Sequence, residues 1–210
     1  MLRKVFIGLV LLIAVLAVIV AVQPSEFTIS RTRTLAAPPD VVFAYLNDFH
    51  QWAGWSPWEK LDPAMKREYS GAPAGAGAIY EWAGNDKVGA GRMTITESVP
   101  PESLSIRLEF LKPFQATNTA EFFITPGGLG TDVTWAMSGH NNFAAKAFSL
   151  VTDMDKIVGA DFEKGLADLD TVTAEAAKAA ALTPPPAIPE PEAPAAEAPP
   201  AEEPAPPAQP

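Results

Sequence analysis

The chain has no cysteine and only two histidines in 210 residues. The absence of cysteine excludes disulfides, thiolate nucleophiles and lipoprotein acylation, although it does not report the redox compartment. His50 and His140 stand far apart in sequence, and neither belongs to a metal-ligand spacing such as H-E-x-x-H. We therefore expect no metal site and no cofactor.

Sequence motifs for catalysis are also missing. The glycines in "GAPAGAGAIY" precede a predicted strand, whereas a dinucleotide-binding loop follows a strand and opens a helix. No G-x-S-x-G elbow occurs, and no nucleophile has an evident activating base. The glutamates of the predicted strands are expected on a solvated face, because glutamate is rarely buried unpaired: Glu68, Glu81, Glu97 and Glu109. We assign no catalytic residue.

Positive charge is scarce, with 15 lysines and arginines against 25 aspartates and glutamates and a formal net charge of −10. Five of the negative charges lie in residues 183–210, and two positive charges, Arg3 and Lys4, stand at the N-terminus. The part between them keeps about −7. A nucleic-acid partner is excluded, because the phosphate backbone requires basic residues.

One long hydrophobic run is present, "VFIGLVLLIAVLAVIVAV" at residues 5–22. At ~1.5 Å per residue a helix of this length covers about 27 Å, close to the roughly 30 Å hydrocarbon core of a bilayer. A secretory signal has a shorter apolar region and a small-x-small cleavage site, whereas this run ends in the poor site "VAVQPSEF". We favour an uncleaved anchor over a cleaved signal.

The orientation of this anchor follows from the flanking charges. Arg3 and Lys4 precede the run, and the next basic residue is Arg31. Positive charge stays on the cytoplasmic side, so residues 1–4 are expected there. The sequence predicts a single-pass inner (cytoplasmic) membrane protein whose remaining chain faces the periplasmic or extracytoplasmic side.

The other end of the chain, residues 183–210, holds twelve prolines and five glutamates. It has almost nothing to bury and cannot offset its own ordering entropy, so we expect a disordered Pro/Ala/Glu-rich tail. Residues 23–182 remain between the anchor and the tail. They suffice for one hydrophobic core, and we predict a single domain.

The pattern within this domain changes twice. Residues 27–35 alternate as a strand, and "AAPPDVVFAYLNDF" at 36–49 has helical spacing. After Pro63, period-two alternation such as "SLSIRLEF" continues for some seventy residues, broken by turn signals such as "VPPES" and "TPGGLG". From Val151 onward apolar residues recur every three or four positions as far as Val172, which predicts a long amphipathic helix. These patterns predict an antiparallel meander covered by a helix.

Several segments carry a resemblance to a known family: "WSPWEKLDPAMKREYSG", "GAIYEWAGN", "GRMTITE" before a "PP" turn, and "MDKIVGADFEKGLADL". With this order of elements, the chain from Phe27 to about Leu169 resembles the START-like (SRPBCC) superfamily, in its polyketide cyclase/dehydrase and lipid-transport branch. The resemblance implies an α+β helix-grip fold, in which a curved antiparallel sheet of about seven strands wraps on a long C-terminal helix. A cavity between sheet and helix is implied as well.

An apolar, aromatic lining is typical of small-molecule sites. The inward positions of the predicted strands and helix, together with the two tryptophans nearest the expected cavity mouth, give the candidate ligand-binding residues: Trp55, Trp58, Trp82, Met93, Ile95, Phe110, Phe122, Trp135, Met137, Met154, Val158 and Phe162. Leu108 shares the same parity. For any one of these residues, plain core packing is an equal alternative.

Three of the five tryptophans stand in "HQWAGWSPWEK". Trp52 continues the apolar face of the preceding helix and is expected in the core. Trp55 and Trp58 stand where this fold has the mouth of its cavity, either as a rim for an apolar ligand or as a structural lid. A membrane-interface belt is a third interpretation.

Two classes of function remain, with a third alternative. The first is a membrane-anchored protein that binds or carries a hydrophobic small molecule or lipid. The second is a cyclase or dehydratase acting in the same cavity, which only the resemblance motivates. The third is a ligand-free protein-interaction module, whose partner the sequence does not identify.

Overall fold

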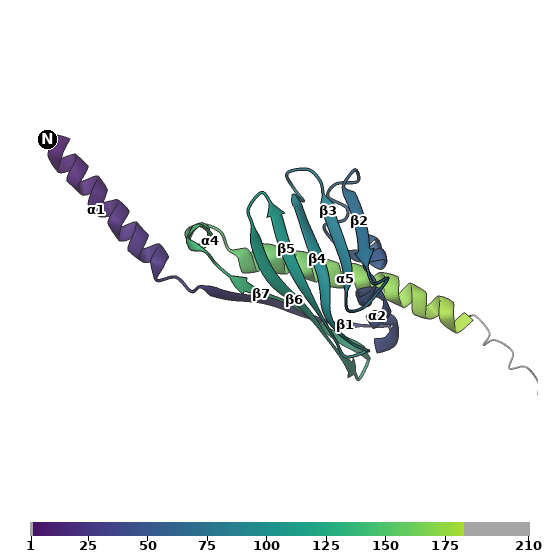
Figure 1. Cartoon of the computed structure of the whole chain (residues 1–210). Coiled ribbons are helices and arrows are strands. Elements are labelled where there is room, and N and C mark those ends of the chain that lie inside the picture. Colours follow the sequence, from purple (N-terminus) through teal and green to yellow (C-terminus); the bar gives the residue numbers. More distant parts are fainter. Residues whose placement is uncertain (1, 183–210) are drawn as a thin grey trace, which may run out of the picture.

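The computed structural model of the chain describes residues 2–182 (Figure 1). The tail predicted for residues 183–210 lies outside the described residues. The elements in chain order are α1 (Leu2–Ala21), β1 (Glu26–Leu35), α2 (Pro39–Asn47), the 3₁₀ turn η1 (Phe49–Gln51), α3 (Trp52–Trp55), β2 (Lys66–Gly71), β3 (Ala78–Ala83), β4 (Ala90–Val99), β5 (Ser103–Lys112), β6 (Ala116–Gly127), β7 (Gly130–His140), α4 (Phe143–Ser149) and α5 (Met154–Leu182).

The seven strands form one antiparallel sheet in the order β1-β7-β6-β5-β4-β3-β2. Strands β2 to β7 follow one another as a meander, and β1 closes the far edge by pairing with β7, with Glu26 opposite His140 and Leu35 opposite Thr131. The sheet curves, and α5 runs across its inner side (Figure 1). The predicted helix-grip architecture is confirmed.

Helix α5 begins at Met154, so the prediction that it starts at Val151 is wrong by three residues. Val151 lies before the helix and is 84% exposed. A separate short helix, α4, occupies the connection from β7, and the apolar periodicity of the sequence did not predict it. Its side chains contribute none of the buried core, so they follow no inward-facing pattern.

Two glycines allow α5 to approach its neighbours closely. A Cβ atom on Gly165 would lie 2.8 Å from Cζ3 of Trp135, so only glycine lets the helix backbone rest on this indole. A Cβ atom on Gly159 would collide with the guanidinium of Arg31. At both positions the group that approaches the helix backbone is a side chain of the sheet.

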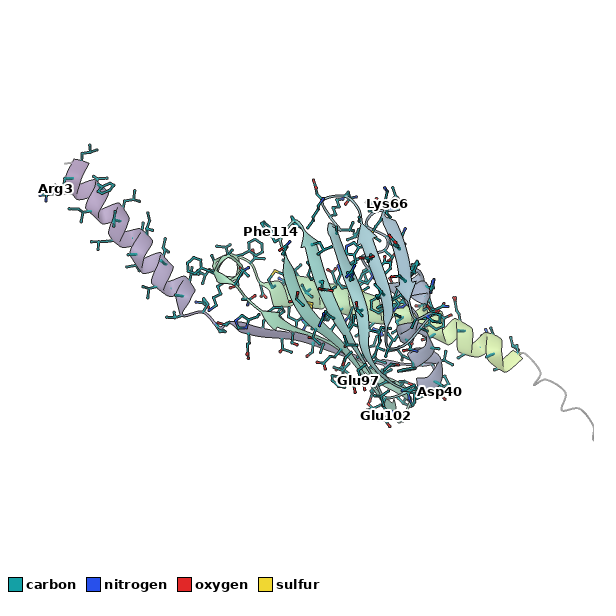
Figure 2. All side chains as sticks on the ribbon, viewed as in Figure 1. Arg3, Asp40, Lys66, Glu97, Glu102 and Phe114 are labelled. Carbon is teal, nitrogen blue, oxygen red and sulfur yellow. The ribbon has the colours of Figure 1, made fainter. Side chains whose placement is uncertain are left out.

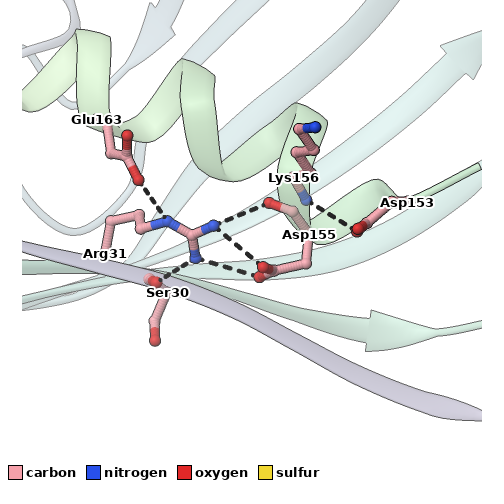
Figure 3. Close-up of polar contacts among 6 residues, drawn as sticks. All are labelled: Ser30, Arg31, Asp153, Asp155, Lys156 and Glu163. Carbon is pink, nitrogen blue, oxygen red and sulfur yellow. Dashed lines mark hydrogen bonds and ion pairs between the residues drawn. The ribbon is translucent and has the colours of Figure 1, made fainter.

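Arg31 of β1 connects the edge of the sheet to the start of α5 through hydrogen bonds and ion pairs (Figure 3). Its Nε donates to Oε1 of Glu163 at 2.9 Å, and its Nη2 donates to the carbonyl oxygen of Asp155 at 3.0 Å. Nη2 also lies 3.1 Å from Oδ2 of Asp155. The hydrogen bond and charge of Arg31 lower the pKa of the Asp155 carboxyl. These polar contacts hold the first three turns of α5 in place, because Asp155 lies in the first turn and Glu163 in the third.

Helix α1 is long and apolar enough to cross a membrane, and it is the one such helix within residues 2–182. Its side chains are exposed except for Val20. Signal sequences share this length and composition, so the helix by itself is compatible with both a span and a signal.

Candidate functional site

A cavity of about 290 Å³ lies between the sheet and the N-terminal half of α5. Strands β3 to β7 supply one wall, α5 supplies the other, and the segment after α3 closes one side. Of the twelve candidate residues, those that line it are Trp58, Trp82, Met93, Phe110, Trp135, Met137, Val158 and Phe162. Leu108 lines it as well.

The other four candidate residues lie outside the cavity wall. Ile95 and Phe122 share the inward parity of Met93 and Trp135, but they are fully buried in the packed core beyond the cavity. Trp55 is also fully buried, against Phe122 and Trp135. Met154 is 40% exposed at the first residue of α5. Inward parity therefore selects the correct face of each strand without showing which part of that face is hollow.

The tryptophan stretch divides into core and cavity wall. Trp52 is buried and its Nε1 donates to the carbonyl oxygen of Leu46 at 3.0 Å, while part of its ring reaches the cavity. Trp58 is half-buried and meets both Trp135 and Phe162 edge to face. Two of the three rings are enclosed by protein, which leaves them no surface for lipid headgroups.

Trp135 and Phe162 form the base of the cavity between sheet and helix. Their rings stack with centroids 4.2 Å apart and planes at 7°. The indole Nε1 of Trp135 is buried and has no hydrogen-bond partner. Burying an N–H group without a hydrogen-bond partner lowers stability by about 1–3 kcal/mol, because the group loses its hydrogen bonds to water.

One corner of the cavity is polar. Glu59 is buried, and its Oε1 accepts a hydrogen bond from the hydroxyl of Tyr80 at 2.5 Å. Its Oε2 pairs with Nε of Arg67 at 2.6 Å. Burial first and the Glu59 carboxylate second raise the pKa of the Tyr80 phenol far above its ordinary value, so the phenol stays protonated. Glu59 and Tyr80 both line the cavity, and Arg67 supports the carboxylate from behind.

The mouth of the cavity lies between the turn joining β3 to β4 and the second turn of α5. Lys87 and Val88 come from the strand turn, and Val158 and Asp161 come from the helix. These four residues are exposed or half-buried, whereas Trp135 and Phe162 at the base are buried. A ligand would enter past the start of α5.

The sequence did not indicate Glu59, because its two partners come from β2 and β3 and the loop between Trp55 and Lys66 has no periodicity. The strand glutamate Glu81 pairs with Arg92 at 2.6 Å, and neither residue lines the cavity. No group of three or more metal-ligating side chains occurs among residues 2–182.

Comparison with known proteins agrees with the fold. A family model described as polyketide cyclase/dehydrase and lipid transport matches residues 26–174. Among curated protein sequences, no relative matches this chain. A solved structure from Chromobacterium violaceum has a TM-score of 0.51 at 18% identity, and the alignment covers 71% of this chain and 98% of that one.

Two other solved structures show the same fold. The Aha1 dimer from Colwellia psychrerythraea aligns with a TM-score of 0.51 at 14% identity, over 70% of this chain and 96% of that chain. The di-domain ARO/CYC StfQ from the steffimycin biosynthetic pathway aligns with a TM-score of 0.52 at 11% identity, over 73% of this chain and 52% of that chain. At these identities the structures support the fold alone, whereas the family model spans more than half of the sequence. The chain is therefore a member of the polyketide cyclase/dehydrase and lipid transport family, with a START-like domain.

Proposed function

We propose that this protein binds or carries a small hydrophobic molecule in the cavity beneath α5 while α1 tethers it to a membrane. The observation that supports this proposal is the cavity itself, whose wall is mostly aromatic and aliphatic. Small-molecule sites have this composition and occupy about 300–1,000 Å³. The observed volume of about 290 Å³ lies at the lower end and favours a compact ligand over a whole diacyl lipid.

The polar groups of the cavity define the rest of the ligand. Oε1 and Oε2 of Glu59 accept hydrogen bonds, and Glu59 and Tyr80 both line the cavity. The proposed ligand has a flat or branched apolar body and a few hydrogen-bonding atoms. A hydroxyl group suits this corner, because it can donate a hydrogen bond to a carboxylate oxygen of Glu59.

The tether belongs to the same proposal. Residues 5–22 would span the inner membrane, residues 1–4 would remain cytoplasmic, and the domain of residues 23–182 would face the extracytoplasmic side. The apolar length of α1 supports a span. Such a tether would keep the cavity close to a source of membrane-soluble ligand.

Ligand binding is tested with the full chain in nanodiscs by titration with N-phenyl-1-naphthylamine, a neutral apolar dye. Energy transfer from the tryptophans around the cavity reports binding. Val158→Trp should fill the cavity mouth and weaken binding by about tenfold or more, equivalent to ~1.4 kcal/mol. The matched control is Val99→Trp, at an exposed position in the final residue of β4. Equal binding by both variants would contradict the proposal.

A second candidate function is a cyclase or dehydratase reaction in the same cavity. The observation that favours it is the Glu59–Tyr80 hydrogen bond at the cavity wall, because it orients a buried carboxylate that could act as a general base. Tyr80→Phe and Glu59→Gln should abolish turnover of any substrate that the wild type converts, while dye binding persists. In the protein-interaction alternative, residues 183–210 would be a spacer or a docking segment, and they lie outside the described residues.

A further inference from the structure

Large apolar side chains are exposed at one end of the sheet, near the cavity mouth. We call them the apolar rim; its residues are Phe114, Phe143, Phe148, Leu150, Val151 and Ile157. Val151 is 84% exposed and Phe114 is 82% exposed. Single exposed apolar residues are ordinary, but a group of them at one place marks a protein or membrane contact.

The rim lies where α1 ends. Glu26 at the start of β1 pairs with His140 at the end of β7, so the chain leaves α1 and enters α4 at the same end of the sheet. Asn141 N donates to the carbonyl oxygen of Ser25 at 2.6 Å. Lys146 of α4 places its Nζ 3.5 Å from the carbonyl oxygen of Ala21, the last residue of α1. If α1 crosses a bilayer, α4 is held at the level of the headgroups.

Helix α4 lacks the support of a core. None of its residues is buried, and both of its phenylalanines, Phe143 and Phe148, are more than half exposed. The residues that continue from it, Leu150 and Val151, are exposed as well. Interfacial helices expose aromatic and aliphatic residues in this way and carry lysine beside them, as α4 carries Lys146.

The opposite end of the sheet has a different surface. Figure 2 places Asp40, Glu97 and Glu102 there, while Phe114 stands at the end that carries the rim. Acidic side chains at that end are repelled by anionic lipid, whereas the rim end carries Lys87, Lys146 and Lys156 beside its aspartates. Leu129, in the turn between β6 and β7, is an isolated exposed apolar residue far from the rim.

The cavity mouth opens beside the rim. Val158 at the mouth follows Ile157 of the rim on α5. The strand turn carrying Lys87 and Val88 packs against the turn carrying Phe114, because Gly89 meets the carbonyl of Lys112 so closely that a Cβ atom would collide with it. The mouth and the rim therefore share one end of the domain.

We propose that the apolar rim inserts into the bilayer that α1 crosses, so that the cavity opens onto lipid and receives its ligand directly from the membrane. This inference rests on the proposed function, because it requires both the anchor and an occupied cavity. It assigns the ligand to molecules that partition into membranes. The rim residues lie at the boundary between headgroups and acyl chains.

The absence of cysteine makes this contact measurable. Full chain carrying one nitroxide-labelled cysteine is placed in vesicles of phosphatidylcholine and phosphatidylglycerol, and depth is read from oxygen against nickel accessibility. Labels at Phe148→Cys and Val151→Cys are expected about 5–10 Å below the headgroup boundary. The matched control Leu129→Cys should remain in water, and Ile13→Cys in α1 should report the bilayer interior.

The outcomes separate the two proposals. If the α1 label reports lipid and the rim labels report water, the rim proposal is overturned while the anchor stands. If the rim labels are shielded from both water and lipid, a second copy of the chain covers the rim and the proposal is overturned as well. If the α1 label reports water, the anchor fails, and the dye titration then decides ligand binding independently. Charged variants Phe148→Asp and Val151→Asp should remove the lipid contact, whereas Leu129→Asp should not.

Discussion

The interface between α5 and the sheet has two halves that are packed differently, although the same amphipathic pattern of α5 runs through both. In the half that includes Leu166 and Leu169, which we call the filled half, these two side chains are almost fully buried and line no cavity. In the half that includes Val158, which we call the hollow half, inward residues such as Met93 and Phe110 are only partly buried and surround the cavity. A regular apolar stripe therefore predicts which face turns inward, and it does not predict whether the space behind it is filled.

The difference comes from the helices before β2. Helices α2 and α3 contact α5, and α2 also reaches β5, β6 and β7. Leu46 and Val42 of α2 are fully buried in the filled half. The loop after α3 contributes Trp58 and Glu59 to one side of the hollow half, and α5 alone covers its centre. Space remains above the curved sheet where α2 contributes no side chains, whereas Val42 and Leu46 of α2 help to fill the other half.

Truncating a buried side chain in the filled half should cause the largest loss of stability. Leu169→Ala removes a fully buried side chain and should lower the free energy of unfolding by roughly 2–5 kcal/mol. Leu108→Ala makes the same change in the wall of the cavity and should lower the free energy of unfolding by clearly less, because it enlarges an existing cavity and creates no new one. Urea unfolding of the full chain in detergent measures both. Equal losses would show that the two halves are packed alike.

Removing the hydrogen bond between Tyr80 and Glu59 in the polar corner of the cavity should cause an intermediate loss of stability. Tyr80→Phe removes a hydrogen bond to a carboxylate and should cost about 1.5–3 kcal/mol, the range for hydrogen bonds to charged groups. Thermal unfolding at neutral pH checks this value.

Tyr80 also predicts a dependence on pH. Its pKa is raised in the folded protein by burial and by Glu59, so above about pH 10 the unfolded chain loses the phenol proton and the folded chain keeps it. Stability from this group is complete below that pH and falls as the pH rises further. Tyr80→Phe should flatten this alkaline decline, and an unchanged decline would contradict the assigned environment.

The contact of Arg31 with α5 should give the smallest effect, because its carboxylate partners are more than 60% exposed. Since Arg31 lowers the pKa of Asp155, the stabilisation is present above the ordinary aspartate pKa of about 3.9 and is lost as the pH falls through the lowered value. Arg31→Gln should increase amide exchange in the first three turns of α5 at neutral pH. Arg92→Gln, which breaks a pair away from α5, should leave that exchange unchanged.

Much of the fold could be predicted from the sequence. Period-two alternation identified the strands, and the spacing of Phe162, Leu166 and Leu169 identified the face of α5 that packs on them. The curvature of the sheet and the presence of a cavity were predicted from the resemblance to the START-like superfamily, because hydrophobic periodicity indicates neither of them. The start of α5 was missed because Val151 continues the helical spacing although it lies in a loop.

The site was predicted less completely. Ile95 and Phe122 have the same parity as residues of the cavity wall, and parity does not show that Phe122 is enclosed by Trp52 and Trp55 of α3. Glu59 becomes a buried carboxylate through Arg67 and Tyr80, eight and twenty-one residues away in sequence. No spacing rule connects three residues whose meeting depends on the course of a loop.

The most direct test of the central claim is methyl NMR of the full chain in nanodiscs during titration with N-phenyl-1-naphthylamine. If the hollow half is a ligand site, the methyl signals of Met93, Met137 and Val158 should shift, whereas those of Leu169 and Ile106 in the filled half should stay. Shifts spread equally over both halves, or none in either, would contradict the account.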